Sequence, residues 1–530
     1  MTSAAHPDQT WTSIPAAVFA TIDRLGDAEA VIDGDVRLTF AELGDRIRRS
    51  AAAMLAAGVG HGDRVAIWAP NGVRWIVAAL GLHCAGATLV PINTRFKGTE
   101  AGHVLRSSGA RLLLTANGFL GIDSIGMLAD VELPALAGIV VLSGDVPGEA
   151  TSWDEFLAGG SGVSDAEVDA RIAAVGPDDV CDIIFTSGTT GTPKGVMMAH
   201  GQTLRQFNDW CDFADLREGD RYLIVNPFFH MFGYKAGWLA CLMRGATVLP
   251  VAVFDVGEAL SVIESERVTV FPGPPTLYQA ILDHLGLERS GSDAPDLSSL
   301  RVAVTGAADI PVDLIRRIRD ELPFERILTG YGLTEAGTVT GTRPEDDAET
   351  IATTAGRPMP GIEVRILEGG VEVGRGETGE VVVRGYNVMS GYFNDPESTR
   401  AAVDAEGWMH TGDLGTMDDM DYVRIVGRIK DLFIVGGFNA YPAEIENLLL
   451  THPGIARAAV IGVPDERMGE VGRAFVVVAG GMALDPEEVI AWSRTHMANY
   501  KVPRSVIVLD ELPLNATGKV MKEELRNYSP

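Results

Sequence analysis

A short loop rich in glycine and hydroxyl side chains carries the clearest chemistry of the sequence. Positions 186–196 read Thr-Ser-Gly-Thr-Thr-Gly-Thr-Pro-Lys-Gly-Val, so a single lysine lies among five hydroxyl residues and three glycines. Glycine lets the backbone approach a ligand closely, hydroxyl and backbone N–H groups bind phosphate oxygens, and lysine adds a point charge. We therefore predict a nucleotide-phosphate loop rather than a plain surface loop. Its predicted ATP-binding residues are Thr186, Ser187, Gly188, Thr189, Thr190, Gly191 and Lys194, with Thr186 also a predicted metal ligand.

The loop is not a Walker A sequence. That pattern has glycine directly before its lysine and Ser or Thr directly after it. Here Pro193 and Gly195 occupy these positions, which disfavours a kinase-like or GTPase-like loop. The string instead resembles the phosphate-loop signature of the AMP-forming adenylating superfamily, which contains acyl-CoA synthetases, luciferases and the adenylation domains of peptide synthetases.

A second segment resembles another core motif of the same superfamily. Positions 331–337 read Tyr-Gly-Leu-Thr-Glu-Ala-Gly. The resemblance implies that Tyr331 stacks against adenine, Thr334 touches the α-phosphate and Glu335 holds Mg²⁺. An aromatic face suits a purine and a hard cation prefers a carboxylate oxygen, although Glu335 could instead be a helix-start carboxylate. The same motif assigns two glycines to the nucleotide site, Gly330 and Gly332.

Two further motifs and Arg428 complete the predicted nucleotide site. The segment 411–415, Thr-Gly-Asp-Leu-Gly, resembles the ribose-binding motif, and its aspartate could accept hydrogen bonds from both ribose hydroxyls. Taken alone, that aspartate would more often be a turn residue. A Gly-Ala-Ala turn after the predicted strand 302–305 resembles the wall against which adenine lies. The residues that these motifs add are Gly306, Ala307, Ala308, Asp413 and Arg428, the last by its implied contact with ribose.

Two lysines toward the C-terminal end are predicted to be catalytic. A Pro-Leu-Asn-Ala-Thr-Gly-Lys segment ends at Lys519 and resembles the motif that carries the adenylation lysine. A mobile ammonium could bridge the substrate carboxylate and the α-phosphate as charge develops; the alternative is an exposed tail lysine. The segments 427–431 and 436–439 resemble the interdomain hinge and the CoA-side loop, which makes Lys430 the hinge and places Gly437 beside the pantetheine path.

The acyl pocket is predicted from an aromatic stretch at 227–238. The superfamily has an aromatic or histidine gate at the position of His230, to which we assign a substrate role and no proton transfer. Lys235 could meet a ketone or carboxyl of a polycyclic substrate, or be a surface lysine. The stretch favours a bulky apolar acid over acetate, since its expected lining is Phe228, Phe229, Met231, Phe232, Tyr234 and Trp238.

The strings at 226–237, 272–276 and 470–477 resemble one branch of the superfamily. That branch contains actinobacterial CoA ligases that act on the propanoate side chain of the steroid C/D-ring remnant, an indane-dione propanoate. The implied function is an ATP-dependent, AMP-forming acid:CoA ligase that uses ATP, CoA and Mg²⁺ and forms an acyl-AMP intermediate. A medium-chain fatty or aromatic acid remains an open alternative.

Three other functions compete with that of a CoA ligase. One is a stand-alone adenylating enzyme that passes its acyl group to an amine or a carrier protein, and another is a luciferase-like oxygenase. A degenerate binding protein would be expected to lack the key side chains, yet Lys194, Glu335, Asp413 and Lys519 are all in place.

Composition limits the partners. The net charge of −29 argues against nucleic acid and anionic membranes, so ATP and CoA must bind to local basic patches. No stretch is long enough to span a bilayer and the first residues are not a signal peptide. Four scattered cysteines predict buried free thiols in the cytoplasm. Homodimerisation is left open.

With 530 residues, the chain should form more than one domain. A strand at 64–68, a helix at 75–85 and a strand at 87–91 indicate an α/β fold. We predict a large N-terminal domain over 1–429, with parallel-rich sheets flanked by helices and a small β-rich subdomain over about 351–429. A small, mobile α+β domain follows over 430–530. The Gly-x-Gly-x-x-Gly pattern at 374–379 leads into a strand, so we interpret it as a turn.

Overall fold

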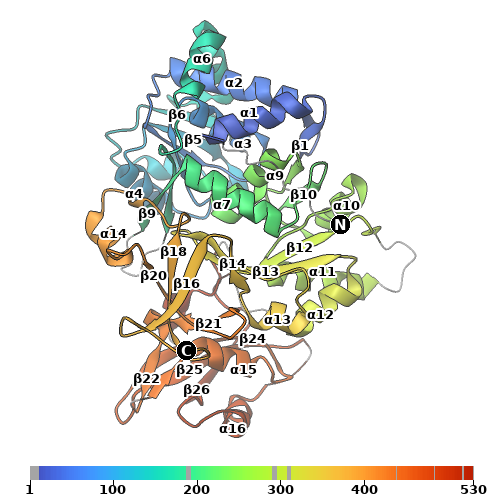
Figure 1. Cartoon of the computed structure of the whole chain (residues 1–530), viewed down its shortest axis with the longest axis vertical. Helices are drawn as coiled ribbons and strands as arrows, with labels where there is room; N and C mark the ends of the chain where they lie inside the picture. Colours follow the sequence, from blue (N-terminus) through green and yellow to red (C-terminus); the bar gives the residue numbers. More distant parts are fainter. Residues whose placement is uncertain are drawn as a thin grey trace.

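The computed structural model describes residues 11–528 except 187–192, 289–294, 307–311, 437, 481, 483 and 516–518. Two parallel-rich sheets form the body of the molecule, which occupies the upper part of Figure 1. In the first sheet, only the pairs β19–β9 and β9–β8 are antiparallel. Its strands are, in order, β19 (Gly391–Tyr392), β9 (Lys194–Ala199), β8 (Val180–Thr186), β4 (Thr88–Pro91), β3 (Arg64–Trp68), β5 (Leu112–Asn117), β6 (Gly138–Gly144) and β7 (Thr151–Ser152).

The second sheet is assembled from two four-stranded parts. Val270 joins them through single parallel bridges to Tyr222 and Val302. One part contains β10 (Arg221–Ile224), β11 (Thr247–Pro250), β1 (Glu29–Asp33) and β2 (Val36–Thr39). The other contains β12 (Val302–Gly306), β13 (Arg326–Leu333), β14 (Gly337–Gly341) and β15 (Arg357–Pro358).

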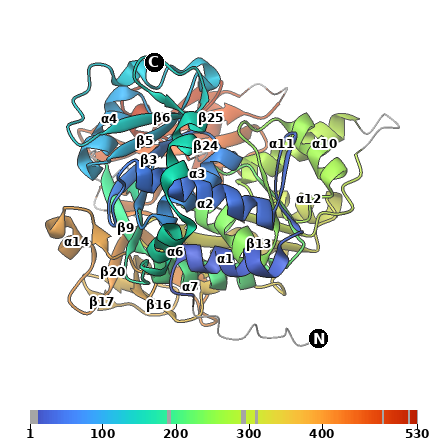
Figure 2. The same ribbon diagram turned by 90° about the horizontal axis from the view of Figure 1, so that it is seen from above.

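The body is layered because strand side chains alternate between two cores. On β3, Val65 and Ile67 enter the central core between the sheets, whereas Ala66 and Trp68 enter an outer core under α4 (Gly98–Ser108). The central core is filled by α1 (Ile14–Leu25), α2 (Phe40–Ala56), α3 (Val73–Cys84), α7 (His200–Phe213) and α9 (Ala240–Arg244). The outer face of the second sheet is covered by α10 (Val256–Glu266), α11 (Pro275–Glu288) and α12 (Val312–Glu321). Figure 2 shows α1, α2 and α3 beside one another across the centre of the body.

Local sequence explains where the first helices begin. Thr39 caps α2, and its side chain and that of Glu42 satisfy each other's backbone N–H groups, which is typical of a Thr-x-x-Glu sequence. Helix α1 begins at Ile14 because Ser13 accepts the N–H of Ala16, and it ends before Gly26. Shorter elements complete the body: η1 (Phe119–Gly121), η2 (Gly126–Leu128), α5 (Trp153–Gly159), η3 (Gly160–Gly162), α6 (Asp165–Ala173), α8 (Met231–Gly233), the π-helix η4 (Tyr234–Leu239) and α13 (Ala348–Thr353).

A wholly antiparallel sheet follows the body. Its strands are, in order, β17 (Val371–Glu372), β16 (Ile362–Glu368), β18 (Gly379–Gly385), β20 (Met409–Met417) and β21 (Val423–Arg428), with α14 (Pro396–Ala402) between β19 and β20. The glycines of the Gly-x-Gly-x-x-Gly pattern lie in the turn before β18 and at its first residue, so no helix follows them. The interpretation as a turn is confirmed.

The last part of the chain is an α+β unit, drawn in orange to red at the bottom of Figure 1. Its strands are β22 (Phe433–Val435), β23 (Phe438–Ala440), β24 (Ile455–Asp465), β25 (Gly469–Val478) and β26 (Ser505–Leu509), and its helices are α15 (Pro442–Leu449), α16 (Pro486–His496) and α17 (Lys522–Arg526). One helical turn, η5 (Ile429–Asp431), separates this unit from β21 and contains the exposed Lys430. A domain boundary and hinge at Lys430 remain predictions.

Two composition-based expectations can be compared with the structure. All four cysteines, Cys84, Cys181, Cys211 and Cys241, are buried and free, as predicted. Within the described residues, no helix combines the length and apolar character that a membrane crossing requires.

Candidate active site

The two ends of the phosphate loop meet at the loop end of the β-hairpin formed by β8 and β9. Strand β8 ends at Thr186 and β9 begins at Lys194, and these two residues pair across the antiparallel ladder. Helix α7 then starts at His200, as expected for a loop between a strand and a helix-bearing segment. The hairpin therefore presents Thr186 and Lys194 side by side. The remaining predicted loop residues, Ser187, Gly188, Thr189, Thr190 and Gly191, lie outside the described residues.

Glu335 lies in a tight turn between β13 and β14. Gln206 and Asn387 both donate side-chain N–H groups to the carbonyl of Ala336, at 2.7 and 2.8 Å. Gly337 closes the turn with φ +55°, and a Cβ there would lie 2.0 Å from the Gln206 amide oxygen. The alternative of a helix-start carboxylate was wrong, since α7 and the 385–390 segment clamp a turn that presents Thr334 and Glu335 as half-buried side chains.

Tyr392 joins Glu335 to the phosphate hairpin, and sequence reasoning missed it. Its hydroxyl donates to Glu335 Oε1 at 3.0 Å. The Lys194 Nζ atom lies 5.2 Å from the centroid of the Tyr392 ring. Burial, reinforced by the charge of Glu335, raises the pKa of Tyr392, so the hydroxyl stays protonated and remains a donor. The structure thus brings Lys194 to the ring and Glu335 to the hydroxyl of one tyrosine side chain.

The predicted ribose and adenine residues form a second cluster. Asp413 lies on β20 rather than in a turn and is almost completely buried. Its two oxygens accept a hydrogen bond from the Tyr331 hydroxyl at 2.5 Å and pair with Arg428 Nε at 3.0 Å. Because each carboxylate oxygen has a second lone pair, the group retains capacity for ribose hydroxyls.

The predicted adenine wall is brought to the same cluster by strand pairing. Gly306, the last residue of β12, pairs with Gly330 of β13, directly before Tyr331. Gly332 is exposed on the same strand. Ala307 and Ala308 lie outside the described residues, and so does Gly437 of the expected CoA-side loop.

Lys519 belongs to the C-terminal unit but faces the nucleotide cluster. Its backbone N–H donates to Asn515 Oδ1 at 2.9 Å, in a turn closed by the bridge between Leu514 and Val520. The side chain reaches solvent, yet the surrounding protein lowers the pKa of its ammonium. The positive charge of Arg428 lowers this pKa further, while the carboxylates of Asp413 and Glu335 oppose the shift. The charge of Lys519 therefore acts together with those of the two carboxylates whose roles the motifs predict.

His230 is a half-buried residue directly before α8. Its Nδ1 accepts the backbone N–H of Phe232 at 3.3 Å and caps α8. Burial lowers the pKa of His230 to about 4, and the charge of Lys519 contributes to the shift. The ring is therefore neutral at pH 7, and because Nδ1 is an acceptor, its proton lies on Nε2. Phe232, which follows in α8, is half-buried.

The expectation for Lys235 was wrong. Its side chain is fully buried and its Nζ lies 2.8 Å from Asp182 Oδ2 and 3.2 Å from Thr203 Oγ1. An ammonium already paired with a buried carboxylate does not face a substrate. Lys235 therefore holds η4 against β8 and is neither a pocket residue nor a surface lysine.

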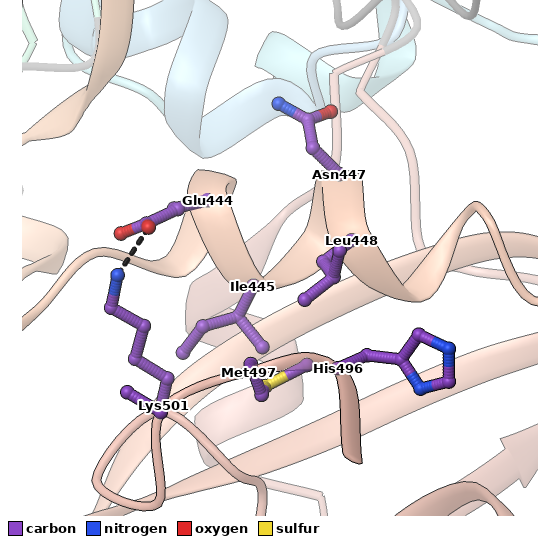
Figure 3. Close-up of a pocket in the computed structure, with 8 residues that line it drawn as sticks. Glu444, Ile445, Asn447, Leu448, His496, Met497 and Lys501 are labelled. Atoms are coloured by element: carbon purple, nitrogen blue, oxygen red, sulfur yellow. Dashed lines mark hydrogen bonds and ion pairs between the residues drawn. The ribbon is translucent and has the colours of Figure 1, made fainter. Parts of the chain in front are cut away.

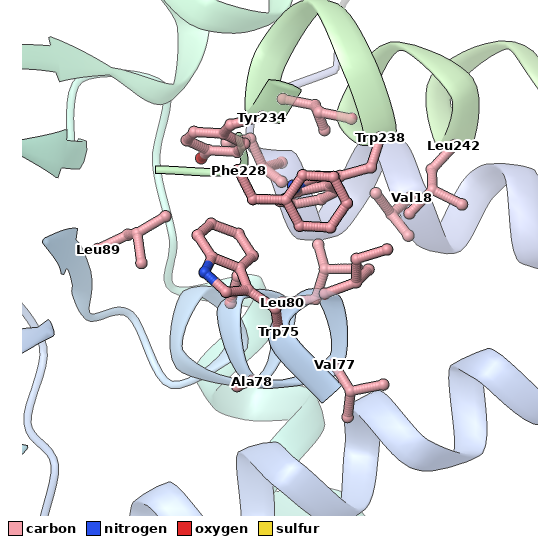
Figure 4. Close-up of a cluster of buried hydrophobic side chains, with 14 of the residues drawn as sticks. Val18, Trp75, Val77, Ala78, Leu80, Leu89, Phe228, Tyr234, Trp238 and Leu242 are labelled. Atoms are coloured by element: carbon pink, nitrogen blue, oxygen red, sulfur yellow. The ribbon is translucent and has the colours of Figure 1, made fainter. Parts of the chain in front are cut away.

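Several aromatic side chains expected in the acyl pocket form core instead. Phe228, Tyr234 and Trp238 are fully buried, and their rings pack around Trp75 of α3 at centroid distances of 5.4 to 6.0 Å. Figure 4 shows these rings facing one another between η4 and α3. Sequence periodicity could not separate them from pocket residues, because a buried aromatic and a pocket aromatic carry the same hydrophobic signal.

A pocket of about 450 Å³ lies elsewhere, on the C-terminal unit. Glu444 and Lys501 form an ion pair across its mouth, and Ile445, Leu448 and Met497 line it (Figure 3). It shares no residue with the site that the motifs predict, so it is not evidence for where the reaction takes place.

The donor set fits a cation held jointly with a nucleotide. In the part of the chain that the structure describes, no three His, Cys, Asp or Glu side chains converge on one point. Mg²⁺ is usually bound by one or two carboxylates together with substrate phosphates, and Glu335 beside Thr186 and Lys194 provides such an arrangement.

Comparison with known proteins now identifies the family. A model described as AMP-binding enzyme matches residues 18–393, and one described as AMP-binding enzyme C-terminal domain matches residues 444–519. The chain belongs to the AMP-binding enzyme family. This confirms the family inferred from the motifs, and the α/β fold with it.

Relatives cover nearly the whole length of this AMP-binding enzyme. Two proteins named 3-(7a-methyl-1,5-dioxo-octahydro-1H-inden-4-yl)propanoyl:CoA ligase, from Rhodococcus jostii and Mycobacterium tuberculosis, are each 52% identical over 97% of this chain and 98% of their own. The crystal structure of ATP-bound MatB from Rhodopseudomonas palustris superposes with a TM-score of 0.87 at 30% identity, covering 97% of this chain and 98% of MatB.

Proposed function

We propose that this enzyme is an AMP-forming acid:CoA ligase that activates an indane-dione propanoate derived from steroid rings. The observation that carries the ligase chemistry is the cluster in which Asp413 accepts the Tyr331 hydroxyl and pairs with Arg428. The charges of Asp413 and Glu335 also act on the Lys519 ammonium. The two relatives that are 52% identical along nearly the whole chain support the choice of acid. The free, buried thiols fit a reducing compartment, and we place the enzyme in the cytoplasm.

In the first step, the substrate carboxylate attacks the α-phosphorus of ATP. A P–O bond to the acyl oxygen forms, the bond to the β-phosphate oxygen breaks, and pyrophosphate leaves. Lys519 stabilises charge between the carboxylate and the α-phosphate, while Asp413 and Arg428 fix the ribose. Glu335 and Thr186 would hold Mg²⁺ with the phosphate oxygens, and the cation would neutralise phosphate charge.

In the second step, the CoA thiolate attacks the acyl carbon and AMP leaves with its phosphate oxygen. Lys519 must withdraw, because the thiol needs access to the face that the lysine occupies. Rotation of the C-terminal unit about Lys430 in η5 would exchange the two faces. Neutral His230, with its proton on Nε2, would contact the acyl group, as expected from the aromatic or histidine gate that the superfamily has at this position.

Product analysis under competition tests the choice of acid. The enzyme is incubated with ATP, Mg²⁺, CoA and an equimolar pool of indane-dione propanoate, a medium-chain fatty acid, an aromatic acid and acetate. We expect the indane-dione thioester to form fastest by mass spectrometry. Faster consumption of the fatty or aromatic acid would reject the steroid-derived substrate, while transfer from acyl-AMP to an added amine in preference to CoA would reject the ligase.

A further inference from the structure

Glu335 is held by a partner that no motif assigned. One of its oxygens, Oε1, accepts the Tyr392 hydroxyl, and its backbone carbonyl accepts the N–H of Met389 at 2.8 Å. Both donors belong to the segment that leads into and forms β19. In the sequence, Tyr392 of this segment is 57 residues from Glu335. A carboxylate with one oxygen engaged by a fixed hydroxyl offers the other oxygen to a cation in a defined direction.

The same side chain restrains the phosphate-loop lysine. The Lys194 ammonium lies 5.2 Å from the Tyr392 ring centroid, within the range of a cation–π attraction. Lys194 starts β9 and Tyr392 pairs with Val196 of that strand, so the ring lies beside the lysine by strand register and not by chance approach of a loop.

The backbone of Tyr392 is fixed on two sides. Its N–H donates to Thr399 Oγ1 of α14 at 2.9 Å, and β19 is attached to the edge of the eight-stranded sheet. Beyond β19, the N–H of Phe393 donates to the Gly195 carbonyl at 2.7 Å. The ring therefore stands on a rigid support rather than on a free loop, which is what precise positioning of a ligand requires.

We propose that Tyr392 is a positioning residue that sets the distance and direction between the metal carboxylate Glu335 and the phosphate lysine Lys194. The inference rests on the proposed nucleotide roles of these two residues. The hydroxyl occupies Oε1 and leaves Oε2 for the cation, while the ring keeps the ammonium on the phosphate side. Tyr392 itself transfers no proton and touches no reacting atom.

Two substitutions separate the hydroxyl from the ring. Tyr392→Phe keeps the ring and removes the hydroxyl donor. The affinity of the enzyme–ATP complex for Mn²⁺ should therefore weaken about tenfold, as measured by electron paramagnetic resonance. ATP binding without a divalent cation should be unchanged in this variant. Tyr392→Leu removes both features and should also weaken cation-free ATP binding.

Tyr386→Phe is the matched control. The Tyr386 hydroxyl also donates to a carboxylate, that of Asp209, and a cation, Arg205, lies over its ring at 3.7 Å. Neither partner belongs to the proposed site, so Mn²⁺ binding should match that of the unaltered enzyme. Equal Mn²⁺ affinity in Tyr392→Phe and Tyr386→Phe would overturn the inference.

The proposed ligase function and the positioning role of Tyr392 would be contradicted by different results. If the unaltered enzyme bound Mn²⁺ and ATP but made no acyl-AMP from any acid, the proposed function would fail while the role of Tyr392 in holding the metal carboxylate could stand. A loss of Mn²⁺ affinity confined to the Tyr392 variants, with unfolding midpoints equal to that of Tyr386→Phe, supports the inference.

Discussion

At the scale of single residues, the buried pair of Lys235 and Asp182 should dominate the local energetics. Lys235→Met would leave the Asp182 carboxylate fully buried without a countercharge, which typically costs about 3–5 kcal/mol. We therefore expect a large drop in the urea concentration at which the N-terminal body is half unfolded. Tryptophan fluorescence measures this midpoint. The double variant Lys235→Met/Asp182→Leu should recover most of the loss.

An exposed ion pair provides the control for that prediction. Arg375 and Asp421 lie 2.6 Å apart with about half of each side chain exposed, so Arg375→Met should change the midpoint little. If the double Lys235/Asp182 variant were as unstable as the single one, apolar replacement would not relieve the burial of charge and the explanation would be wrong.

Lys519 makes a prediction about pH at the same scale. Its pKa is lowered by the surrounding protein and by Arg428, so its ammonium deprotonates at a lower pH than an ordinary lysine. The kcat/KM of adenylation, which reports the free enzyme, should then decline with rising pH before an ordinary lysine would titrate. Lys519→Arg should lack this decline because guanidinium stays protonated. Identical alkaline limbs would assign the decline to another group.

At the scale of elements, α3 and α7 should make the body sensitive to acid. His83 of α3 lies against Tyr234 at 3.1 Å, and its ring packs edge-on to that of His200 at 5.3 Å. Burial lowers the pKa of His83 to about 3 and that of His200 well below its ordinary value of 6.5. The unfolded chain therefore binds more protons than the folded one between about 6.5 and about 3.

The sign of this linkage fixes the expected result. Stability is fully present above the ordinary histidine pKa and is lost as pH falls through this window. His83→Gln removes one titrating group, so its thermal midpoint should fall less steeply with acidification than that of the unaltered enzyme. Parallel curves would show that His83 is not a source of the acid sensitivity.

Elements also show what sequence could predict. The strand over Arg64–Trp68 and the capping box of Thr39 were predictable, because each depends on residues close in sequence. Strand β19 was not, since it is two residues long and exists only through its pairing with β9. Tyr392 was missed for the same reason. Its importance comes from its contacts with Glu335 and Lys194, and no local sequence pattern connects it with these two residues.

The buried charges set a similar limit. Lys235 was expected to contact substrate or to lie at the surface, because the local sequence does not show that Asp182 of β8 is its partner. In contrast, Asp413, Tyr331 and Arg428 do come together as predicted, because each belongs to a recognisable motif whose role was assigned as part of the nucleotide site.

At the scale of the whole molecule, the account requires the C-terminal unit to move about η5. Lys430→Pro should preserve acyl-AMP formation and impair thioester formation, because proline restricts the backbone rotation that exchanges the two faces. Lys519→Ala should do the reverse and still convert supplied acyl-AMP to the thioester. Each half-reaction is measured separately by quenched mass spectrometry, and equal impairment of both steps in both variants would contradict the two-state account.

The most direct test of the central claim is the product balance of one reaction. The unaltered enzyme is given ATP, Mg²⁺, CoA and indane-dione propanoate, and nucleotides and thioesters are quantified together. The account predicts AMP, pyrophosphate and the acyl-CoA thioester in equal amounts, each dependent on the acid. Formation of ADP in place of AMP, or acyl-AMP that accumulates without thioester while CoA is present, would contradict it.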